Sequence, residues 1–484
     1  MFKKKKIKKK NQKNMSNYFW IIVLFLVFIF GVFAFSYAHK IDLLSQEKIT
    51  NIKQEKSENQ SQEKIAINKE NKEKLAKIKK QDKNKINILL IGRGGRLNDA
   101  PNLTDSIMLV SINTKLKTIS IFSIPRDLYI KYKNWKYWRI NKIYALEKHK
   151  TWSKQAWIDA LEYNVEAITW EKIDYYINID FEGFIKFVDA IWGIEITVPK
   201  KLVDYKFPDG NWWYTTFVIR KWTWLFDWET ALKYARSRHS TSDFDRSLRQ
   251  QQIIKAIRDK FVDWWFFENI SNIKKAYEIF KKYVDTDIWL WDAIKIFSEV
   301  KDNDYKIISS NLNDSCFEWD NHCIKGWFLY VPERSLFWWA SVLLVKWSQV
   351  WNLNNYKKIK KYLYFVFDNP LVYKENIDIS VLNSTKTPLL AWNTAFELRK
   401  YWFNIPFKKE AVSTIRNELI EKSFINYKES IKDSETLKEL KKIFPNIEFR
   451  EVEDLKYSMD SDAQIEIIIW QDYKKIFDDL KNNL

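Results

Sequence analysis

Short apolar runs alternate with amphipathic stretches from residue 86 onwards. The short runs predict strands, and the stretches with an apolar residue every three or four positions predict helices. Runs of six or seven residues rich in β-branched side chains predict strands at 86–91, 106–112, 118–124, 174–179 and 193–198. Apolar residues that recur every three or four positions predict helices at 156–168, 181–191 and 246–262. Strands that alternate with helices favour an α/β fold, with an α-β-α layered domain around a central mixed sheet over residues 85–265.

A second strand–helix–strand pattern begins near the C-terminal end of the chain. An apolar strand at 376–385 is followed by a helical pattern from residue 393, and a further strand covers 464–470. We expect a small α+β domain over residues 373–472. The intervening residues 266–372 show no clear period, and we treat them as a mixed connecting region.

Residues 18–38 form an uncharged apolar run that directly follows a basic tail at residues 1–17. About 20 apolar residues are enough to cross a bilayer as a helix, and the lysines before them place the N-terminus in the cytoplasm. We therefore expect a single-pass anchor in the cell membrane, a charged stalk at 39–84 and extracytoplasmic domains. A cleaved signal peptide is the alternative, although its apolar region would ordinarily be shorter.

The chain carries 25 Trp and only 8 Gly, which inverts the usual ratio of the two residues. Several Trp lie in stretches that read as turns and helix ends, where glycine tolerates a positive φ and an indole does not. Abundant Lys, Ile and Asn indicate an AT-rich genome. Our hypothesis is that the source organism reads UGA as glycine and that these codons were translated as Trp. An aromatic-rich surface is the alternative.

The net charge of +19 indicates an anionic partner, although lysine enrichment accounts for part of it. We do not expect nucleic acid, because the arginine-rich motifs follow the predicted anchor and would lie outside the cytoplasm. Two Cys occur, Cys316 and Cys323. In that compartment so close a pair favours a small-loop disulfide over a metal site.

The stretch ALKYARSRHSTSDFDRSLRQQQ, residues 231–252, concentrates basic side chains where one predicted helix ends and the next begins. An extended segment would point Arg236 and Arg238 the same way, and the next helix N-terminus adds exposed N–H groups. Guanidinium forks match phosphate oxygens, so a pyrophosphate would suit this array. A surface ion-pair network with Asp243 and Asp245 is the alternative. The candidate anion-binding residues are Arg236, Arg238, Arg246, Arg249 and Gln250.

Three further polar residues flank two neighbouring predicted strands. Asp105 stands at the start of one strand, and Arg126 and Asp127 follow the end of the next. If the strands are antiparallel neighbours, the three side chains gather at one sheet end. A carboxylate beside phosphate-binding arginines is a natural Mg²⁺ ligand, whereas a structural role in tying loop backbone is the alternative.

Five stretches, in order along the chain, resemble the LytR-CpsA-Psr family, whose members are membrane-anchored bacterial phosphotransferases of the cell envelope. These stretches are LTDSIMLVSIN, SIPRDLY, RINKIYAL, IDYYINIDFEGFIKFVDAIWGIEITVP and ETALKYARSRHSTSDFDRSLRQQQ. The resemblance covers roughly residues 85–265 and implies glycine at Trp192 and commonly at Trp228. The last unit is similar to a LytR C-terminal domain, with glycine at Trp392 and Trp402.

The resemblance implies transfer of a glycan phosphate from a polyprenyl-pyrophosphate carrier to a hydroxyl of peptidoglycan, with Mg²⁺ as cofactor. By resemblance, Asp105 would bind Mg²⁺ and assist deprotonation of the acceptor. Asp127, Asp243 and Arg249 would support the site. The residues that would hold the pyrophosphate are Arg126, Arg236, Arg238, Arg246 and Gln250.

One departure concerns the metal. Many members carry an acidic residue soon after the first strand, where this chain has Arg93 and Gly94. Asp99 is the candidate for the second metal carboxylate. Two other functions stay open at this point, a non-catalytic protein that binds the lipid carrier or the cell wall, and a DNA-binding envelope regulator, which the expected topology disfavours.

Overall fold

The computed structural model describes most of the chain beyond residue 83. The described residues are 84–97, 100–132, 136–208, 213–238, 243–262, 282, 284–300, 304–312, 328–346, 348, 355–406, 408–415 and 422–484. The expected tail and anchor, almost all of the stalk, Asp99 and both Cys lie outside these ranges. Within them, no helix is both long enough and apolar enough to span a bilayer.

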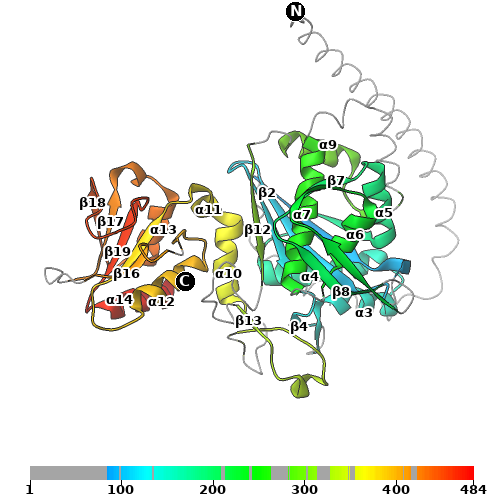
Figure 1. Ribbon diagram of the computed structural model, residues 1–484. Coiled ribbons are helices and arrows are strands. Elements are labelled where there is room, and N and C mark those ends of the chain that lie inside the picture. Colours follow the sequence, from blue (N-terminus) through cyan, green and yellow to red (C-terminus); the bar gives the residue numbers. More distant parts are fainter. Residues whose placement is uncertain are drawn as a thin grey trace, which may run out of the picture. The chain divides into compact units, whose positions relative to one another are not determined.

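A six-stranded mixed sheet forms the centre of the first domain, as the alternation of strands and helices predicts (Figure 1). Its order is β11 (Val284–Thr286), β6 (Tyr175–Asp180), β1 (Lys85–Arg93), β2 (Thr104–Asn113), β3 (Thr118–Ile124) and β12 (Lys306–Asn311). The β1–β2, β2–β3 and β6–β11 pairs are antiparallel, whereas β1–β6 and β3–β12 are parallel. Every strand predicted here between residues 86 and 179 lies in this sheet.

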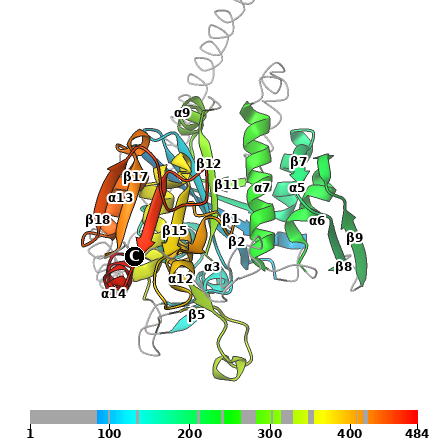
Figure 2. The same cartoon turned by 60° about the vertical axis from the view of Figure 1, so that its left-hand side comes forward.

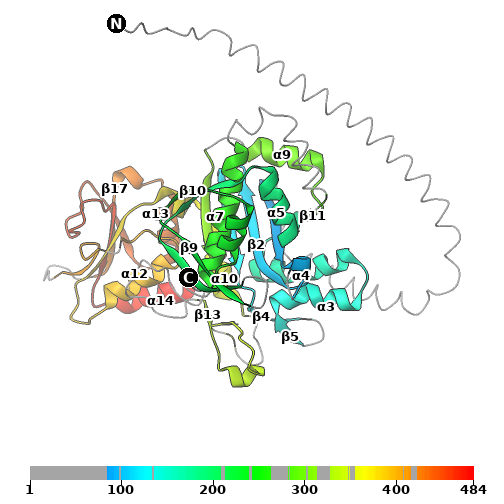
Figure 3. The same ribbon diagram turned by 45° about the vertical axis from the view of Figure 1, so that its right-hand side comes forward.

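Alternate residues of the central strands enter two different cores. Leu89, Ile91 and Ile107 face α3 (Ile143–Lys150) and α4 (Lys154–Thr169). Their neighbours Ile88, Met108 and Val110 face the opposite layer, which contains α7 (Asp243–Val262) and α9 (Leu290–Val300). Because successive side chains of a strand point to opposite faces, one apolar run supplies both cores. Figure 3 shows α7 lying along the sheet beside β2.

Both edge strands of this sheet come from beyond residue 265. β11 pairs with β6 at one edge, and β12 pairs with β3 at the other. The first domain therefore extends past the boundary expected at 265, into the region interpreted as a connection. These strands are too short to show a clear hydrophobic pattern in the sequence, because β11 has three residues and β12 has six.

A third core joins α5 (Phe181–Ala190), α6 (Trp228–Arg236) and α7 to two antiparallel strand pairs (Figure 2). The pairs join β7 (Ile194–Val198) with β10 (Trp222–Phe226), and β8 (Leu202–Pro208) with β9 (Tyr214–Ile219). The strand predicted at 193–198 thus lies outside the central sheet. A bulge between Asp204 and Phe207 lets both of these side chains face the core.

The C-terminal residues build a second, five-stranded sheet. Its order is β16 (Val412–Thr414), β15 (Ile379–Asn383), β19 (Ile465–Ile469), β17 (Phe424–Lys428) and β18 (Glu448–Val452). The helices of this unit are α12 (Leu390–Arg399), α13 (Glu435–Ile443) and α14 (Tyr473–Asn483). The α+β pattern expected over 373–472 is present and runs on to residue 483. Its assignment as a LytR C-terminal domain stays a prediction.

Tryptophan occupies backbone positions that ordinarily call for glycine. In the described part of the chain, eight non-glycine residues have a positive φ, and five of them are Trp. Trp170 and Trp338 cap helix ends in the left-handed region, and Trp192 precedes Gly193, which is itself at φ +79°. A left-handed conformation costs an L-residue about 1–2 kcal/mol. This placement is what the recoding hypothesis predicts. The five residues are Trp170, Trp192, Trp338, Trp339 and Trp402.

We expect Trp192→Gly and Trp338→Gly each to raise the free energy of unfolding by about 1 kcal/mol, because glycine removes the left-handed strain. Trp338 is 95% exposed, so little packing is lost. Trp152→Gly is the matched control, since Trp152 is fully exposed but lacks a positive φ. Denaturant unfolding measures all three. An equal change in the control, or Trp at position 192 in mass spectra of the native protein, would contradict the recoding hypothesis.

Candidate anion-binding site

The antiparallel pairing of β2 and β3 brings Asp105 and Arg126 together. Ile107 of β2 lies opposite Ile124 of β3, so the start of β2 meets the chain that leaves β3. Arg126 Nη1 donates to Asp105 Oδ1 at 2.8 Å. The juxtaposition predicted from the strand ends is confirmed.

Asp127 lies on the other side of the same arginine. Its Oδ2 is 3.7 Å from Arg126 Nε, and its Oδ1 accepts from Arg139 Nη1 at 2.9 Å. Arg139 returns to this place because β4 (Tyr129–Lys131) pairs with β5 (Tyr137–Arg139), with Arg139 opposite Tyr129. Asp127 therefore bridges two guanidinium groups.

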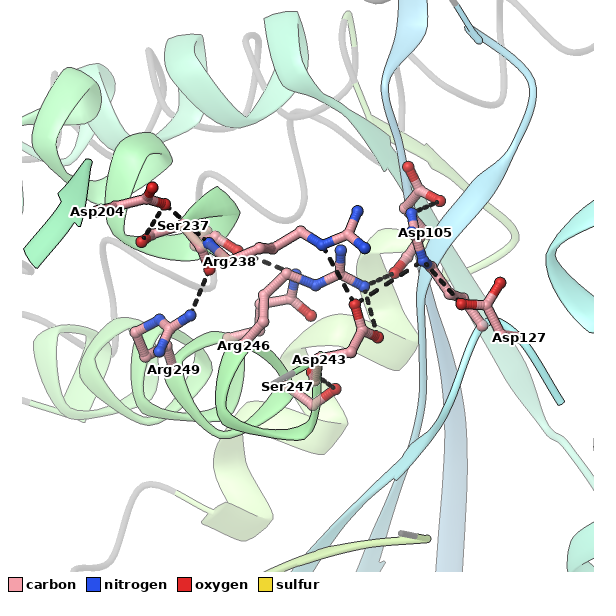
Figure 4. Close-up of polar contacts among 12 residues, drawn as sticks. Asp105, Asp127, Asp204, Ser237, Arg238, Asp243, Arg246, Ser247 and Arg249 are labelled. Atoms are coloured by element: carbon pink, nitrogen blue, oxygen red, sulfur yellow. Dashed lines mark hydrogen bonds and ion pairs between the residues drawn. The ribbon is translucent and has the colours of Figure 1, made fainter. Parts of the chain in front are cut away.

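Asp243, the first residue of α7, is the carboxylate that three arginines share (Figure 4). Arg246 Nη2 donates to its Oδ2 at 3.1 Å. The Nε atoms of Arg238 and Arg126 lie 3.5 Å and 3.8 Å from its Oδ1. Arg246 Nη2 also donates to the backbone oxygen of Asp105 at 3.0 Å, which links α7 to β2.

The buried arginine of this cluster is short of counter-charge. Burial, together with the positive charges of Arg126 and Arg238, lowers the pKa of Arg246 to about 10, against the attraction of Asp243. For Arg126, burial works in the same direction, but the attraction of Asp105, Asp243 and Asp127 outweighs it and raises the pKa. The Nε atoms of Arg126 and Arg246 are buried without a hydrogen-bond acceptor. An incoming anion would relieve both the charge and the unmet donors.

A small pocket opens among these side chains, between the end of the sheet and the first turns of α7. Five of the predicted site residues line it, namely Asp105, Arg126, Asp243, Arg246 and Gln250. Ser106, Ser123 and Ser247 add hydroxyl groups to the lining. The lining thus combines two guanidinium groups with two carboxylates and three hydroxyl groups, and its guanidinium and hydroxyl donors suit a phosphate group.

Arg236 and Arg249 have other neighbours. Arg236 is the last residue of α6, and its guanidinium lies over the rings of Phe181 and Phe207, at 4.7 and 5.6 Å. Contrary to our prediction, Arg236 and Arg238 do not point to one target, because the chain is helical at Arg236 and not extended. A role for Arg236 in holding pyrophosphate stays a prediction from the resemblance.

Arg249 braces the end of α6. Its Nε donates to the backbone oxygen of Tyr234 at 3.1 Å, and its Nη2 donates to that of Ser237. The side chain is buried, and burial lowers its pKa. These donors are directed at backbone carbonyls, which positions the end of α6. Direct contact of Arg249 with the substrate stays a prediction.

Sequence reasoning missed Asp204, Gln251 and Arg139. Asp204 and Gln251 are buried, and they bond to Ser237 and Ser123, which are far away along the chain. No local sequence pattern therefore indicates their role. Gln251 donates to Ser123 Oγ at 2.6 Å and to the backbone oxygen of Ser310 at 2.7 Å, which pins α7 to β3 and β12. Arg139 is the first residue of the RINKIYAL stretch quoted above. Its separation from Asp127 along the chain gave no reason to place the two side chains together.

Within the described ranges, no group of three or more acidic, histidine or cysteine side chains is arranged to hold a metal ion. Asp105 stays the candidate Mg²⁺ ligand, and its Oδ1 accepts from Arg126 in this structure. Mg²⁺ commonly takes one or two carboxylates and completes its shell with phosphates and water. Arg93 is a cation and adds no carboxylate at this place. Its Nε donates to Asn178 Oδ1 at 2.7 Å.

Comparison with known proteins identifies the family of the chain. Residues 47–336 match the LytR_cpsA_psr family. The chain belongs to this family. The match ends beyond β12, in line with the sheet edges that lie past residue 265.

Relatives of the chain carry two kinds of name. A protein of Bacillus cereus (strain AH820) named polyisoprenyl-teichoic acid–peptidoglycan teichoic acid transferase TagU is 26% identical over 255 residues, 52% of this chain and 75% of that protein. TagV of Bacillus subtilis (strain 168), named as the same kind of transferase, is 29% identical over 40% of this chain and 47% of its own. The regulatory protein MsrR of Staphylococcus aureus (strain Mu50) is 29% identical over 42% of this chain and 57% of its own.

Solved structures resemble the chain only loosely. The crystal structure of TagV from B. subtilis aligns with 60% of this chain and 99% of its own, at 23% identity and a TM-score of 0.42. A structure of TagT bound to LI-WTA aligns with the same TM-score. The fold of this chain is given by its own strand pairing.

We expect Asp243→Asn to lower the free energy of unfolding by about 1–3 kcal/mol, because three guanidinium groups lose their shared counter-charge. Inorganic pyrophosphate should then raise the melting temperature of the variant more than that of the wild type. Glu195→Gln, at an exposed position on β7, is the control and should change neither value. Thermal unfolding with and without pyrophosphate measures the effect. Equal pyrophosphate shifts in variant and wild type would contradict an anion site at Asp243.

Proposed function

We propose that the protein is a membrane-anchored phosphotransferase that moves a glycopolymer from a polyprenyl-pyrophosphate carrier to peptidoglycan. The observation that carries the proposal is the group of three arginines, Arg126, Arg238 and Arg246, around one carboxylate beside a small polar pocket. The names of the TagU and TagV relatives support the same reaction class. The proposal extends that class to this chain.

The arginines would bind the pyrophosphate and stabilise the charge that develops during transfer. Phosphoryl transfer needs mainly positioning and charge neutralisation, which fixed donors in a partly buried site supply. An acceptor hydroxyl oxygen of peptidoglycan attacks the phosphorus that carries the glycan. The bond between this phosphorus and the oxygen that bridges the two phosphates breaks, and polyprenyl phosphate leaves. The hydroxyl proton passes to the carboxylate of Asp105.

Mg²⁺ is the proposed cofactor, with Asp105 as its ligand in the described part of the chain. When bound, the ion would neutralise phosphate charge and orient the pyrophosphate. Asp99, the expected second carboxylate, lies outside the described residues. Residues 18–38, the proposed anchor, would hold the site near a lipid-linked donor at the outer face of the membrane.

A second candidate is a non-catalytic protein that binds the lipid carrier. It is favoured by one observation, the Arg93–Gly94 pair where many family members have an acid. The arginine cluster would then retain the pyrophosphate without transferring its glycan. Turnover separates the two functions.

We expect full-length protein in lipid nanodiscs to release polyprenyl phosphate from a pyrophosphate-linked glycan when peptidoglycan is added. Arg126→Ala and Arg246→Ala should each lower the rate by about 100-fold or more, because each removes a charged donor from the transition state. Arg220→Ala, at an exposed position beyond β9, is the control and should keep the wild-type rate. Tight binding of the donor without release would support the carrier-binding protein instead.

We expect release to stop with EDTA and to return with Mg²⁺. Asp105→Asn should raise the Mg²⁺ concentration needed for half-maximal rate by about 10-fold or more, because it removes a charged ligand. Titration of the rate with MgCl₂ measures this shift. Full activity in EDTA, or an unchanged Mg²⁺ requirement in the variant, would contradict Asp105 as the metal ligand.

A further inference from the structure

Asp204 is a fully buried carboxylate that lies outside every motif of the sequence. Its relative exposure is 0%, and its neighbours on β8 and β9 are the apolar side chains Leu202, Phe207 and Phe217. A charge in such a place is costly unless hydrogen bonds satisfy it. The bulge of β8 supplies one of them, from the backbone N–H of Lys206 to Asp204 Oδ1 at 3.1 Å.

The other oxygen of Asp204 holds the turn that follows α6 (Figure 4). Its Oδ2 accepts from Ser237 Oγ at 2.8 Å and from the backbone N–H of Arg238 at 2.9 Å. These contacts join β8 to a segment more than 30 residues later in the chain. They fix the backbone from which the Arg238 side chain starts.

Arg249 holds the same turn from the opposite direction. It donates from α7 to the backbone oxygens of Tyr234 and Ser237, while Asp204 accepts the Ser237 hydroxyl. The turn is thus clamped between a carboxylate on β8 and a guanidinium on α7. The Arg238 side chain, by contrast, is 42% exposed and reaches Asp243 only through a 3.5 Å ion pair.

We propose that Asp204 is a positioning residue for Arg238, which it holds at the backbone so that the guanidinium meets the pyrophosphate. The proposal rests on the proposed function only in naming pyrophosphate as the ligand. A long, half-exposed arginine with one weak side-chain contact has many rotamers. Clamping its backbone reduces the entropy lost when the anion binds. Asp204 is not among the residues that line the pocket, so it acts through Arg238.

A double-mutant cycle tests the proposal in the full-length protein, with geranylgeranyl pyrophosphate as the binding probe. We expect Asp204→Asn to weaken binding by about 10-fold in the wild-type background. In the Arg238→Ala background, the same change should weaken binding less than about twofold, because the side chain that Asp204 positions is already gone. Equal losses in the two backgrounds would overturn the proposal, since they would show a general effect on the fold.

A second variant and a control keep the test decisive if Asp204→Asn folds poorly. Ser237→Ala removes one donor to Asp204 and should weaken binding by a smaller factor, again only when Arg238 is present. Glu466→Gln is the matched control, because Glu466 is a fully buried carboxylate of the C-terminal sheet that accepts from the backbone N–H groups of Tyr457 and Ser458. It should lower stability without changing probe affinity.

The outcomes separate this inference from the proposed function. Non-additive binding without release of polyprenyl phosphate would keep Asp204 as a positioning residue and reject the transferase. Release with additive effects would keep the transferase and reject the positioning role. A wild-type protein that does not bind the probe would overturn the inference, because Arg238 would then have no pyrophosphate to meet.

Discussion

The carboxylate of Asp243, shared by three guanidinium groups, is the interaction on which the rest of the site depends. Three like charges within a few ångströms repel one another, and the repulsion is strong because the site is partly shielded from water. Asp243 offsets it from the first turn of α7, where a negative charge also meets the positive end of the helix dipole. The guanidinium groups therefore stay together, and Asp105 and Asp127 add counter-charge at Arg126. The Nε atoms of Arg126 and Arg246 lack an acceptor, and they are the donors that an anion would meet.

The contact between Asp243 and the arginines requires a fixed position of α7. Asp243 reaches Arg126 only if α7 is held against the end of the sheet, and two kinds of contact hold it there. Ile254 packs on the apolar face of the sheet, and Gln251 bonds to β3 and β12. On the far side, Asp204 and Arg249 clamp the turn that carries Arg238. Donors fixed in this way need little reorganisation when charge develops, which is how electrostatic catalysis is efficient.

The arginines themselves divide into two groups according to what their donors meet. Arg126, Arg238 and Arg246 face carboxylates beside the pocket, so a phosphate can compete for them. Arg249 faces backbone carbonyls, and Arg236 lies over aromatic rings. Spacing along the chain does not distinguish Arg236, Arg238, Arg246 and Arg249, because all four lie in the one basic stretch of residues 231–252. The partners that distinguish them come from other elements, such as α5 and β8 for Arg236 and α6 for Arg249.

By itself the sequence determined the types and order of the elements with a clear period, the family, and the juxtaposition of Asp105 with Arg126. Those features follow from local periodicity and from antiparallel pairing of consecutive strands, both of which are written in neighbouring residues. Only the tertiary structure decided that β11 and β12 close the sheet, that Arg249 serves the backbone, and that Asp204 holds Arg238. Each of these depends on contacts between residues far apart in the chain, and on burial that the local pattern does not reveal. The role of a short edge strand or of a buried carboxylate depends on the partner that the fold places next to it.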